Sequence, residues 1–337
     1  MKIWFPTINT NSGSDMFVRR LSSALDNKGI NTVITWFPHW RELLPYFVNK
    51  PSPPINTDII HVNSWHGFSF YHKNIPLVTT CHHCVHDSAY KTNSSLMQKI
   101  YHTSLIYKFE RETFLKSSAV NTVSDYSTKI VTDKFIDISP ITIPNGINTD
   151  YFKPASNGIK ATLNRKFRIF YAGNLSQRKG ADLIPGIMNQ LDDNVELRYS
   201  SGLSKKNINL GRNCIRLGFL TDKELLEEYQ QCDAVLYPSR YEGFGYVACE
   251  AMACGKPVIA SRCSALTELI VDGVTGFLCN PDDTLSFAMA IQKLASSRQL
   301  CLNLGRAGRE RIKRHYTEQK MAEEYIRLYS DILNKHN

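Results

Sequence analysis

The sequence predicts an α/β protein of two domains, each a parallel sheet flanked by helices. The chain has 337 residues, which suits two α/β domains of about 150 residues each. An apolar strand, a loop of small residues and a helix open the chain at residues 3–25, and the same unit recurs from residue 168. A third such unit, at residues 233–253, carries two glutamates around a glycine loop.

Composition narrows the functional classes. With 42% hydrophobic and 21% charged residues, the chain is an ordinary globular protein. No run approaches the ~20 apolar residues of a membrane span, and residues 1–6 are too short for a signal peptide, so we expect a cytoplasmic protein. The nine scattered cysteines are expected to be reduced and mostly buried.

The net charge of +9 is spread along the chain, with +4 on residues 1–155 and +5 on the remainder. A nucleic-acid binder would gather its cations in one arm or patch, interleaved with aromatic residues, and no such cluster is present in the sequence. The charge instead suits small anionic substrates or an anionic membrane surface. We therefore expect no nucleic-acid partner.

The first predicted unit begins with a strand at residues 3–6 and a polar loop at 7–15. The helix that follows carries Phe17, Val18, Leu21 and Leu25 on one face and ends near Gly29. Further strands are predicted at residues 31–36, 58–62, 76–82 and 120–124.

An aromatic insert follows the second strand. It contains Trp36, Phe37, Trp40, Tyr46 and Phe47. Such rings stack on sugars, enter a lipid interface or cover a domain core. The sequence leaves these alternatives open.

The strand at residues 76–82 places His82 at its C-terminal end, where parallel sheets bind ligands. A competing hypothesis is a metal site built from Cys81, His82, His83, Cys84 and His86. Structural zinc sites draw two ligand pairs separated by a loop, and no second pair is present in the sequence. We therefore expect no metal site.

Residues 95–116 predict one long helix with lysines and an arginine around it. The residues on or near its apolar face are Met97, Ile100, Tyr101, Leu105 and Phe109. A basic amphipathic helix either lies on an anionic membrane or packs one face on its own domain. We expect the second arrangement, with the charges in solvent.

The polar stretch at 155–165 is the predicted domain boundary and hinge. The domains are expected at residues 1–155 and 156–318, with a final helical segment at 319–337. The tail from residue 286 is predicted to be helical, and Arg306, Arg309, Lys313 and His315 are expected on its surface.

The second domain opens with a strand at 168–172 and a loop that contains Arg178 and Lys179. Two cations ahead of a helix suit a pyrophosphate, because they neutralise its charge as it departs. Further strands are predicted at residues 195–199 and 215–220.

The third unit is a buried strand at 233–237, a loop and a helix that starts near Tyr246. Gly243 and Gly245 permit backbone conformations that other residues avoid. The backbone amides at the start of the helix can then bind a diphosphate. Glu250, one turn into the helix, can accept two hydrogen bonds from a diol such as ribose, and Glu242 stays on the loop. The backbone amides that can bind the diphosphate belong to Phe244, Gly245, Tyr246 and Val247.

This stretch, YPSRYEGFGYVACEAMAC at 237–254, resembles the signature of the retaining GT-B glycosyltransferases of family 4. In that family a glutamate, GFG and a second glutamate bracket a nucleotide-sugar. The similarity continues through GKPVIAS at 255–261, TELIVDGVTGFL at 267–278 and NPDD at 280–283. It covers nearly the entire chain, most strongly from residue 167 to 283.

The resemblance implies a GT-B fold, with two Rossmann-like domains facing across a cleft and a C-terminal helix that returns to the first domain. It implies donor binding by Lys179 and Gly13 and a sugar-facing role for His82. Departures occur where the family carries glycine or arginine, namely at Ser12, Asn174, Cys263 and Ser264. Arg178 is the expected substitute for the missing arginine.

These implications give a retaining, metal-independent hexosyltransferase that needs no cofactor beyond its nucleoside-diphosphate-sugar donor. Glu242 and His82 are the expected catalytic residues. The expected acceptor is a glycan or a lipid-linked intermediate of surface polysaccharide or lipopolysaccharide synthesis, with peripheral contact at the inner membrane face left open. The alternatives are a GT-B nucleotide-sugar epimerase and a catalytically silent nucleotide-sugar binding protein.

Overall fold

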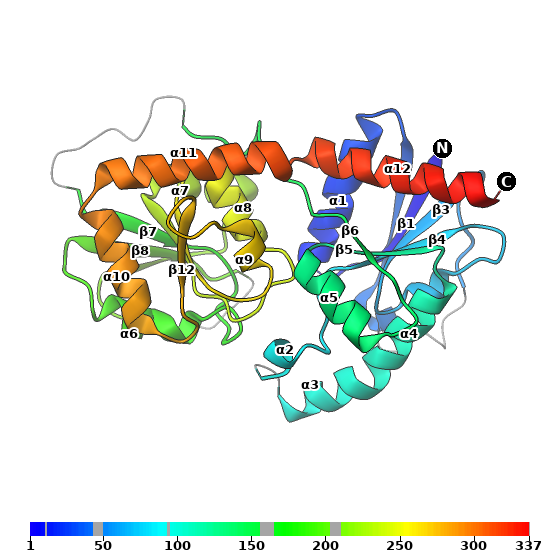
Figure 1. Cartoon of the computed structure of the whole chain (residues 1–337), viewed down its shortest axis with the longest axis horizontal. Helices are drawn as coiled ribbons and strands as arrows, with labels where there is room; N and C mark the ends of the chain where they lie inside the picture. Colours follow the sequence, from blue (N-terminus) through cyan, green and yellow to red (C-terminus); the bar gives the residue numbers. More distant parts are fainter. Residues whose placement is uncertain (11, 43–49, 93–94, 156–164, 203–209, 337) are drawn as a thin grey trace. The chain divides into compact units, whose positions relative to one another are not determined.

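The computed structural model describes residues 1–10, 12–42, 50–92, 95–155, 165–202 and 210–336. They form two compact units (Figure 1). Unit 1 comprises Met1–Gly146 and Thr317–Asn337, and unit 2 comprises Ile147–Tyr316. The sequence predicts a domain boundary at residue 155, and the two compact units divide after Gly146. The Ile147 amide donates to the Tyr316 carbonyl at 2.8 Å within unit 2. Residues 156–164 of the predicted hinge at 155–165 lie outside the described residues.

Unit 1 is built on a six-stranded sheet in the order β2-β1-β3-β4-β5-β6, and every adjacent pair is parallel. The strands are β1 (Lys2–Ile8), β2 (Asn31–Phe37), β3 (Ile59–Asn63), β4 (Leu77–Cys81), β5 (Ala119–Thr122) and β6 (Ile141–Thr142). The helices are α1 (Gly13–Asp26), α2 (Ser88–Thr92), α3 (Leu96–Tyr101), α4 (Tyr107–Lys116), α5 (Asp125–Lys134) and α12 (Glu318–His336). Short helical turns are η1 (His39–Glu42), η3 (Gly67–Phe70) and η4 (His102–Ile106).

Helices α1 and α12 pack together in unit 1 (Figure 1). The predicted apolar face of α1 is confirmed, since Phe17, Val18, Leu21 and Leu25 are all buried. They share a core with residues of β1 and β3 and with the apolar side of α12. The last helix of the chain therefore completes the core of the first unit.

A buried polar network joins α12 to the sheet. His61 Nδ1 lies 2.6 Å from the Tyr329 hydroxyl, and His61 Nε2 lies 2.7 Å from Thr80 Oγ1. Thr80 donates to Asn121 Oδ1 at 2.9 Å, and the Asn121 amide donates to the Tyr325 hydroxyl at 2.7 Å. Because buried polar groups are costly without hydrogen-bond partners, this network fixes the position of α12 against β3, β4 and β5.

Burial makes the stability of unit 1 sensitive to acid. Burial is the main cause that lowers the pKa of His61 to about 3, of His66 to about 4 and of His82 to about 3. An unfolded histidine titrates near ~6.5. The unfolded chain therefore binds protons first, so this stability is present above pH ~6.5 and is lost as the pH falls towards these folded values. Each histidine contributes a slope of up to about 1.4 kcal/mol per pH unit.

Tryptophan fluorescence can follow this loss, because all four tryptophans of the chain lie between residues 4 and 65, in unit 1. Denaturant unfolding at pH 7, 6 and 5 should show a falling free energy of unfolding. In His61→Gln the slope against pH should be shallower, whatever the absolute stability of the variant. An unchanged slope in that variant would contradict the assignment of His61 as a titrating group in this window.

The predicted helix at 95–116 is interrupted. It consists of α3, the π-helical turn η4 and α4, and its buried residues, such as Ile106 and Phe109, come from η4 and α4. Met97, Ile100 and Leu105 are exposed. The expectation that this apolar face packs on the domain is wrong for these three, because α3 has no buried residue and Leu105, in η4, is also exposed.

The aromatic insert is partly described. Trp36 and Phe37 end β2, and the Phe37 ring packs against Phe70 with centroids 5.3 Å apart. The core alternative is therefore confirmed for Phe37, whereas Trp40 is exposed. Tyr46 and Phe47 lie outside the described residues.

Unit 2 contains a second six-stranded parallel sheet in the order β12-β11-β10-β7-β8-β9. The strands are β7 (Phe167–Tyr171), β8 (Val195–Ser200), β9 (Cys214–Gly218), β10 (Ala234–Tyr237), β11 (Val258–Ser261) and β12 (Gly276–Cys279). The helices are η5 (Ala181–Leu183), α6 (Ile184–Met188), α7 (Asp222–Gln231), α8 (Tyr246–Ala253), α9 (Leu266–Leu269), α10 (Thr284–Ala295) and α11 (Arg298–His315).

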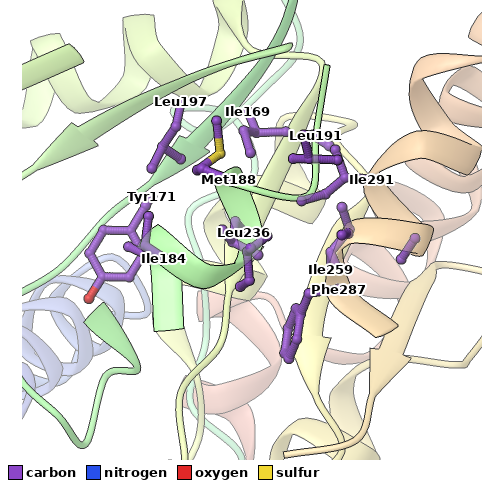
Figure 2. Packing of buried hydrophobic residues seen from close by; sticks show 14 of the residues in the cluster. Ile169, Tyr171, Ile184, Met188, Leu191, Leu197, Leu236, Ile259, Phe287 and Ile291 are labelled. Carbon is purple, nitrogen blue, oxygen red and sulfur yellow. The ribbon is translucent and has the colours of Figure 1, made fainter. Parts of the chain in front are cut away.

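One face of this sheet carries the main core of unit 2 (Figure 2). Alternate residues of β7, β8, β10 and β11 meet apolar residues of α6 and α10 there. The labelled contacts include Ile169, Leu197, Leu236, Ile259, Ile184, Met188, Phe287 and Ile291. These buried strands hold the loops at their C-terminal ends in fixed positions.

The structure also tests the expectations for the cysteines and for Arg309. All nine cysteines are free thiols, and seven of them are buried. Arg309, expected on the surface, instead donates to the carbonyl oxygens of Phe152, at 3.2 Å, and of Ala253. It thereby caps the end of α8. Among the described helices, none is both long and apolar enough to cross a membrane.

Candidate active site

The loop between β10 and α8 is the centre of the candidate site in unit 2. All four residues of β10 are buried, so the strand fixes where the loop starts. At its other end Gly245 has a φ of +109°, and a Cβ built there would lie 2.8 Å from Leu266 Cδ2. Both the backbone conformation and the space require glycine at this position.

Helix α8 starts directly after Gly245. Its first helical hydrogen bond runs from the Cys249 amide to the Gly245 carbonyl at 3.1 Å, so the amides of Tyr246 and Val247 precede the helical ladder. The positive end of the helix is therefore at this loop. The Phe244 side chain is buried against the rings of Tyr246 and Tyr316, so only its backbone is available for binding.

Glu242 lies on the loop within a dense set of donors. Its Oε1 is 2.5 Å from Lys179 Nζ, 2.5 Å from Ser239 Oγ and 3.6 Å from Arg178 Nη1. Its backbone amide donates to Ser264 Oγ at 2.9 Å. Side chain and backbone of Glu242 are thus both held in place.

These contacts keep Glu242 ionised. Burial would raise the pKa of this carboxyl, but the Lys179 ammonium, the Arg178 guanidinium and the hydrogen bonds from Lys179 and Ser239 lower it to about 2. Burial lowers the pKa of Lys179, and Glu242 opposes that effect. Lys179 and Glu242 therefore form a buried pair of an ammonium and a fixed carboxylate. An anion bound beside Lys179 would further favour the charged form of the lysine.

The loop that carries Lys179 is pressed against the β10 loop. Gly180 has a φ of +69°, and a Cβ there would lie 2.0 Å from the Pro238 carbonyl oxygen. Lys179 Nζ also donates to the Tyr237 hydroxyl at 3.2 Å. Arg240 contacts Asp182 at 2.8 Å, which ties the β10 loop to the segment after Lys179, and it also contacts Asp282, between β12 and α10, at 2.6 Å.

Arg178 and Asn174 occupy different places in this loop. Arg178 Nη1 donates to the Tyr241 carbonyl at 2.9 Å, which keeps the guanidinium beside Glu242. Asn174, at the position where the resemblance implies an arginine, lies against Gly202, where an added Cβ would be 2.1 Å from Asn174 Oδ1. The guanidinium beside Glu242 therefore belongs to Arg178, and residue 174 contributes no cation there.

Glu250 lies on α8, and its side chain is buried. Its Oε2 accepts a hydrogen bond from the Tyr229 hydroxyl at 3.0 Å. Tyr229 comes from α7 and is fully buried, so it orients the carboxylate from behind. A diol would be bound by this oriented carboxylate without the cost of ordering it.

Unit 1 places two predicted site residues at the same edge of its sheet. His82 directly follows β4, and Gly13 is the first residue of α1. The Phe17 ring, one turn into α1, meets the His82 ring edge-on with centroids 4.6 Å apart. His82 Nε2 lies 3.0 Å from Asn63 Oδ1. Because Asn63 Oδ1 can only accept a hydrogen bond, His82 Nε2 carries the hydrogen in this contact. Nδ1 of the neutral ring then has the free lone pair and can accept a hydrogen bond.

The residues of the metal hypothesis are engaged separately. His82 contacts Asn63, whereas His86 pairs with the buried Glu110 at 2.8 Å, and Ser64 donates to the same Glu110 at 2.7 Å. No group of three His, Cys, Asp or Glu side chains within the described part of the chain is arranged to hold a metal ion.

Four residues that contact the predicted site residues are not indicated as such by the sequence: Tyr229, Tyr237, Ser239 and Ser264. Ser239 follows the strand in YPS, a pattern that indicates only a strand end. Ser264 is 22 residues from Glu242 and has a φ of +41°. It stands where the family usually has glycine, and its hydroxyl accepts the Glu242 amide, so this departure adds a contact to the loop.

The fold and the site together define the class of the protein. Two Rossmann-like units with parallel sheets are the GT-B architecture, and a sucrose-phosphate synthase from Thermosynechococcus elongatus has the same fold, with a TM-score of 0.84 at 21% identity over 99% of this chain and 100% of that one. The chain belongs to the group 1 GT-B glycosyltransferases. The family model "Glycosyl transferases group 1" matches residues 152–311, and "Glycosyltransferase Family 4" matches residues 11–151.

Curated relatives agree with this family. A capsular polysaccharide biosynthesis glycosyltransferase of Staphylococcus aureus is 25% identical over 68% of this chain and 66% of its own length. An N-acetyl-alpha-D-glucosaminyl L-malate synthase of Bacillus anthracis is 33% identical over 38% of this chain and 33% of its own. The chain thus spans less than two thirds of the length of these relatives.

Proposed function

We propose that this glycosyltransferase transfers a sugar from a nucleoside diphosphate to a hydroxyl acceptor, with retention at the anomeric carbon. The observation that carries the proposal is the contact of 2.5 Å between Lys179 and Glu242 at the start of α8. The contact places the Lys179 ammonium beside the loop that leads into α8. An ammonium and the positive end of a helix at one loop suit a diphosphate leaving group.

Donor binding is proposed to involve three parts of unit 2. Glu250, oriented by Tyr229, accepts hydrogen bonds from the ribose hydroxyls. The α8 amides after Gly243, together with Lys179 and Arg178, hold the diphosphate. A structural neighbour, an Anabaena protein solved in complex with UDP, has a TM-score of 0.77 at 18% identity over 98% of this chain and 100% of that one, and it supports a nucleotide ligand for this fold.

In the proposed step, the bond from the anomeric carbon to the diphosphate oxygen breaks and a bond to the acceptor oxygen forms on the same face. The leaving phosphate oxygen takes the acceptor proton. Lys179, Arg178 and the positive end of α8 stabilise the charge that develops on the diphosphate. These groups supply the charge that a divalent cation would supply, so we expect full activity in the presence of a chelator.

Glu242 is proposed to position the donor, not to act as a nucleophile. Its Oε1 already accepts from Lys179 and Ser239, and its low pKa makes it a weak nucleophile. His82 is proposed to orient the sugar from unit 1 through a neutral ring, and Gly13 to let the start of α1 approach the donor closely. The neutral ring follows from the lowered pKa of His82.

A glycine substitution tests the loop. Gly245→Ala should cost about 1–3 kcal/mol of unfolding free energy for its left-handed φ and should weaken binding of the donor nucleotide, because the new Cβ meets Leu266 and shifts the start of α8. Gly211→Ala is the matched control, with a φ of +104° and no heavy atom within 4 Å of the added Cβ. Thermal unfolding and nucleotide titration check both. Equal nucleotide affinity in the two variants would contradict the role of the loop.

The acceptor is proposed to be a glycan or a lipid-linked intermediate of surface polysaccharide or lipopolysaccharide synthesis, used on the cytoplasmic side. The capsular polysaccharide relative supports this class.

The test is an assay of the purified chain with UDP-, GDP- and ADP-sugars and a panel of glycan and lipid-linked acceptors. NMR of the product should show the anomeric configuration of the donor. An inverted product would contradict retention. Conversion of the donor sugar without an acceptor would indicate an epimerase, and tight donor binding without turnover would indicate a silent binding protein.

A further inference from the structure

A cavity lies at the edge of the unit 2 sheet where β10 and β11 begin. Its volume is about 420 Å³, within the range of about 300–1,000 Å³ that is typical of small-molecule sites. Asp233 and Pro257 directly precede these two strands, and both line the cavity. The loop that carries Glu242 follows the other end of β10. The cavity and the proposed donor loop therefore lie at opposite edges of the sheet.

Close packing holds the walls of this cavity in place. Helix α11 packs on α8 (Figure 1). A Cβ added at Gly305 of α11 would lie 2.0 Å from the Gly255 carbonyl oxygen, in the loop after α8. Gly255 has a φ of +73°, and a Cβ added there would lie 3.3 Å from the Pro154 ring. Because the backbones approach so closely, the cavity is a preformed feature of unit 2.

The residues that line the cavity carry four positive charges and one negative charge. The cations are Lys256, Arg298, Arg306 and Arg309, and the carboxylate is Asp233. Arg165, which is not part of the lining, contacts Asp233 at 2.5 and 2.7 Å and balances its charge. Among the described residues, no ion pair joins the four cations to an acid, and the one acid of α11, Glu310, contacts Lys313. The cavity thus has an uncompensated positive charge.

Lys256 is the buried cation of this set. The residue is 8% exposed, and its Nζ donates to the carbonyl oxygens of Gln230 and Cys232 at 2.8 and 2.7 Å. An ammonium has three donors, so one N–H of Lys256 has no acceptor among the described residues. Both of its partners are neutral, and a buried charge is costly without a counter-ion. An anion in the cavity would supply both the acceptor and the counter-ion.

One face of α11 forms a wall of the cavity. Arg298, Leu302 and Arg306 follow one another at intervals of four residues, which places them on the same side of the helix, and all three line the cavity. Both arginines are exposed, and Leu302 is 52% exposed. Guanidinium groups match the geometry of a phosphate, and Leu302 adds apolar surface between them. The wall is therefore complementary to a ligand that has an anionic group and an apolar body.

We propose that this cavity binds a small organic phosphate. The phosphate contacts the unused donor of Lys256 and the guanidinium groups of Arg298 and Arg306, and the apolar body of the ligand lies against Leu302. The site goes beyond the proposed function and does not depend on it, because the proposed donor loop is at the other edge of the sheet.

The test is calorimetric titration of the whole chain with phenyl phosphate, which joins a phosphate to an apolar ring, and separately with inorganic phosphate and with phenol. We expect phenyl phosphate to bind at one site, at least about tenfold more tightly than either part. Arg298→Ala/Arg306→Ala should weaken its binding by about tenfold or more. The matched control is Arg212→Ala/Lys223→Ala, with side chains 71% and 84% exposed, and it should bind as the parent does.

A substitution on the α11 wall tests the charge of the cavity. Leu302→Glu places a carboxylate between the two arginines and should abolish binding of phenyl phosphate. Leu302→Gln has the same shape without the charge and should weaken binding only a few-fold. Leu302 is half exposed, so both variants should fold, and thermal unfolding checks this. Equal binding by Leu302→Glu and Leu302→Gln would overturn the proposal.

The titration is repeated on Lys179→Ala, because the proposed donor loop also suits a phosphate. Binding of phenyl phosphate should be unchanged in this variant and in the presence of a nucleotide, so a failure of the proposed function would leave the result intact. Absence of saturable binding of phenyl phosphate, or equal loss in the two double variants, would contradict the site. So would a loss in Lys179→Ala without a loss in Arg298→Ala/Arg306→Ala, because the probe would then occupy the donor loop.

Discussion

Replacing Lys179 with alanine is expected to lower kcat/KM for sugar transfer by about 10²- to 10³-fold, which is the range for removing one preorganised group that stabilises developing charge. The ammonium is the closest cation to Glu242, at 2.5 Å, and its side chain is only 16% exposed. In water such a charge is screened, but at this site it acts at short range. Steady-state kinetics with the identified donor measure the effect, and Lys223→Ala, at an exposed lysine, should retain the parent rate.

A structural role for Lys179 must be separated from a role in binding the diphosphate. Loss of Lys179 leaves the Glu242 carboxylate with less compensation, so part of the effect could arise from the loop itself. The double variant Lys179→Met/Glu242→Gln removes both charges. If Lys179 binds the diphosphate, affinity for the nucleoside diphosphate stays low in the double variant while affinity for the nucleoside is unchanged. Recovery of diphosphate affinity in the double variant would show that Lys179 serves only the carboxylate.

Glu250→Gln is expected to weaken binding of a ribonucleoside diphosphate by roughly 30- to 100-fold, the equivalent of about 2 to 3 kcal/mol for a lost charge-assisted hydrogen bond. The amide keeps the shape of the side chain but replaces one acceptor oxygen by a donor. The carboxylate is buried and held by Tyr229 at 3.0 Å, so no other rotamer is expected to compensate. Calorimetric titration measures the change.

A modified ligand makes this result specific to the ribose. A 2′,3′-dideoxynucleoside diphosphate lacks the diol, so it should bind the parent and Glu250→Gln with equal affinity. Tyr229→Phe removes the hydroxyl that orients Glu250 and should produce a smaller loss with the ribonucleotide. If Glu250→Gln weakened the dideoxy ligand as much as the ribonucleotide, Glu250 would be acting on something other than the diol.

Local patterns in the sequence predict much of this fold. The strands of both sheets are short apolar runs followed by small or polar residues, and β10, with four buried residues, is a clear case. The face of α1 follows from helical spacing, and all nine cysteines are free as expected. The GT-B fold and the family follow from the spacing of Glu242, the glycine loop and Glu250 together with the flanking motifs.

Other features depend on contacts between distant residues and cannot be seen in a local pattern. Ser264 reaches the Glu242 amide across 22 residues, and Arg309 reaches Phe152 across 157. The predicted helix at 95–116 contains a π turn, and α3 before that turn has no buried residue, which helical periodicity alone does not reveal. Periodicity identifies an apolar face but not whether the domain covers it.

Unit 2 is proposed to bind the nucleotide of a sugar donor through Glu250 and the loop before α8. The most direct test is calorimetric titration of the whole chain with UDP, GDP and ADP and with their common sugar conjugates, repeated on Glu250→Ala. We expect one nucleotide to bind selectively at a single site, and its binding to be lost or strongly weakened in the variant. Absence of binding to every nucleotide, or equal binding by the parent and Glu250→Ala, would contradict the claim.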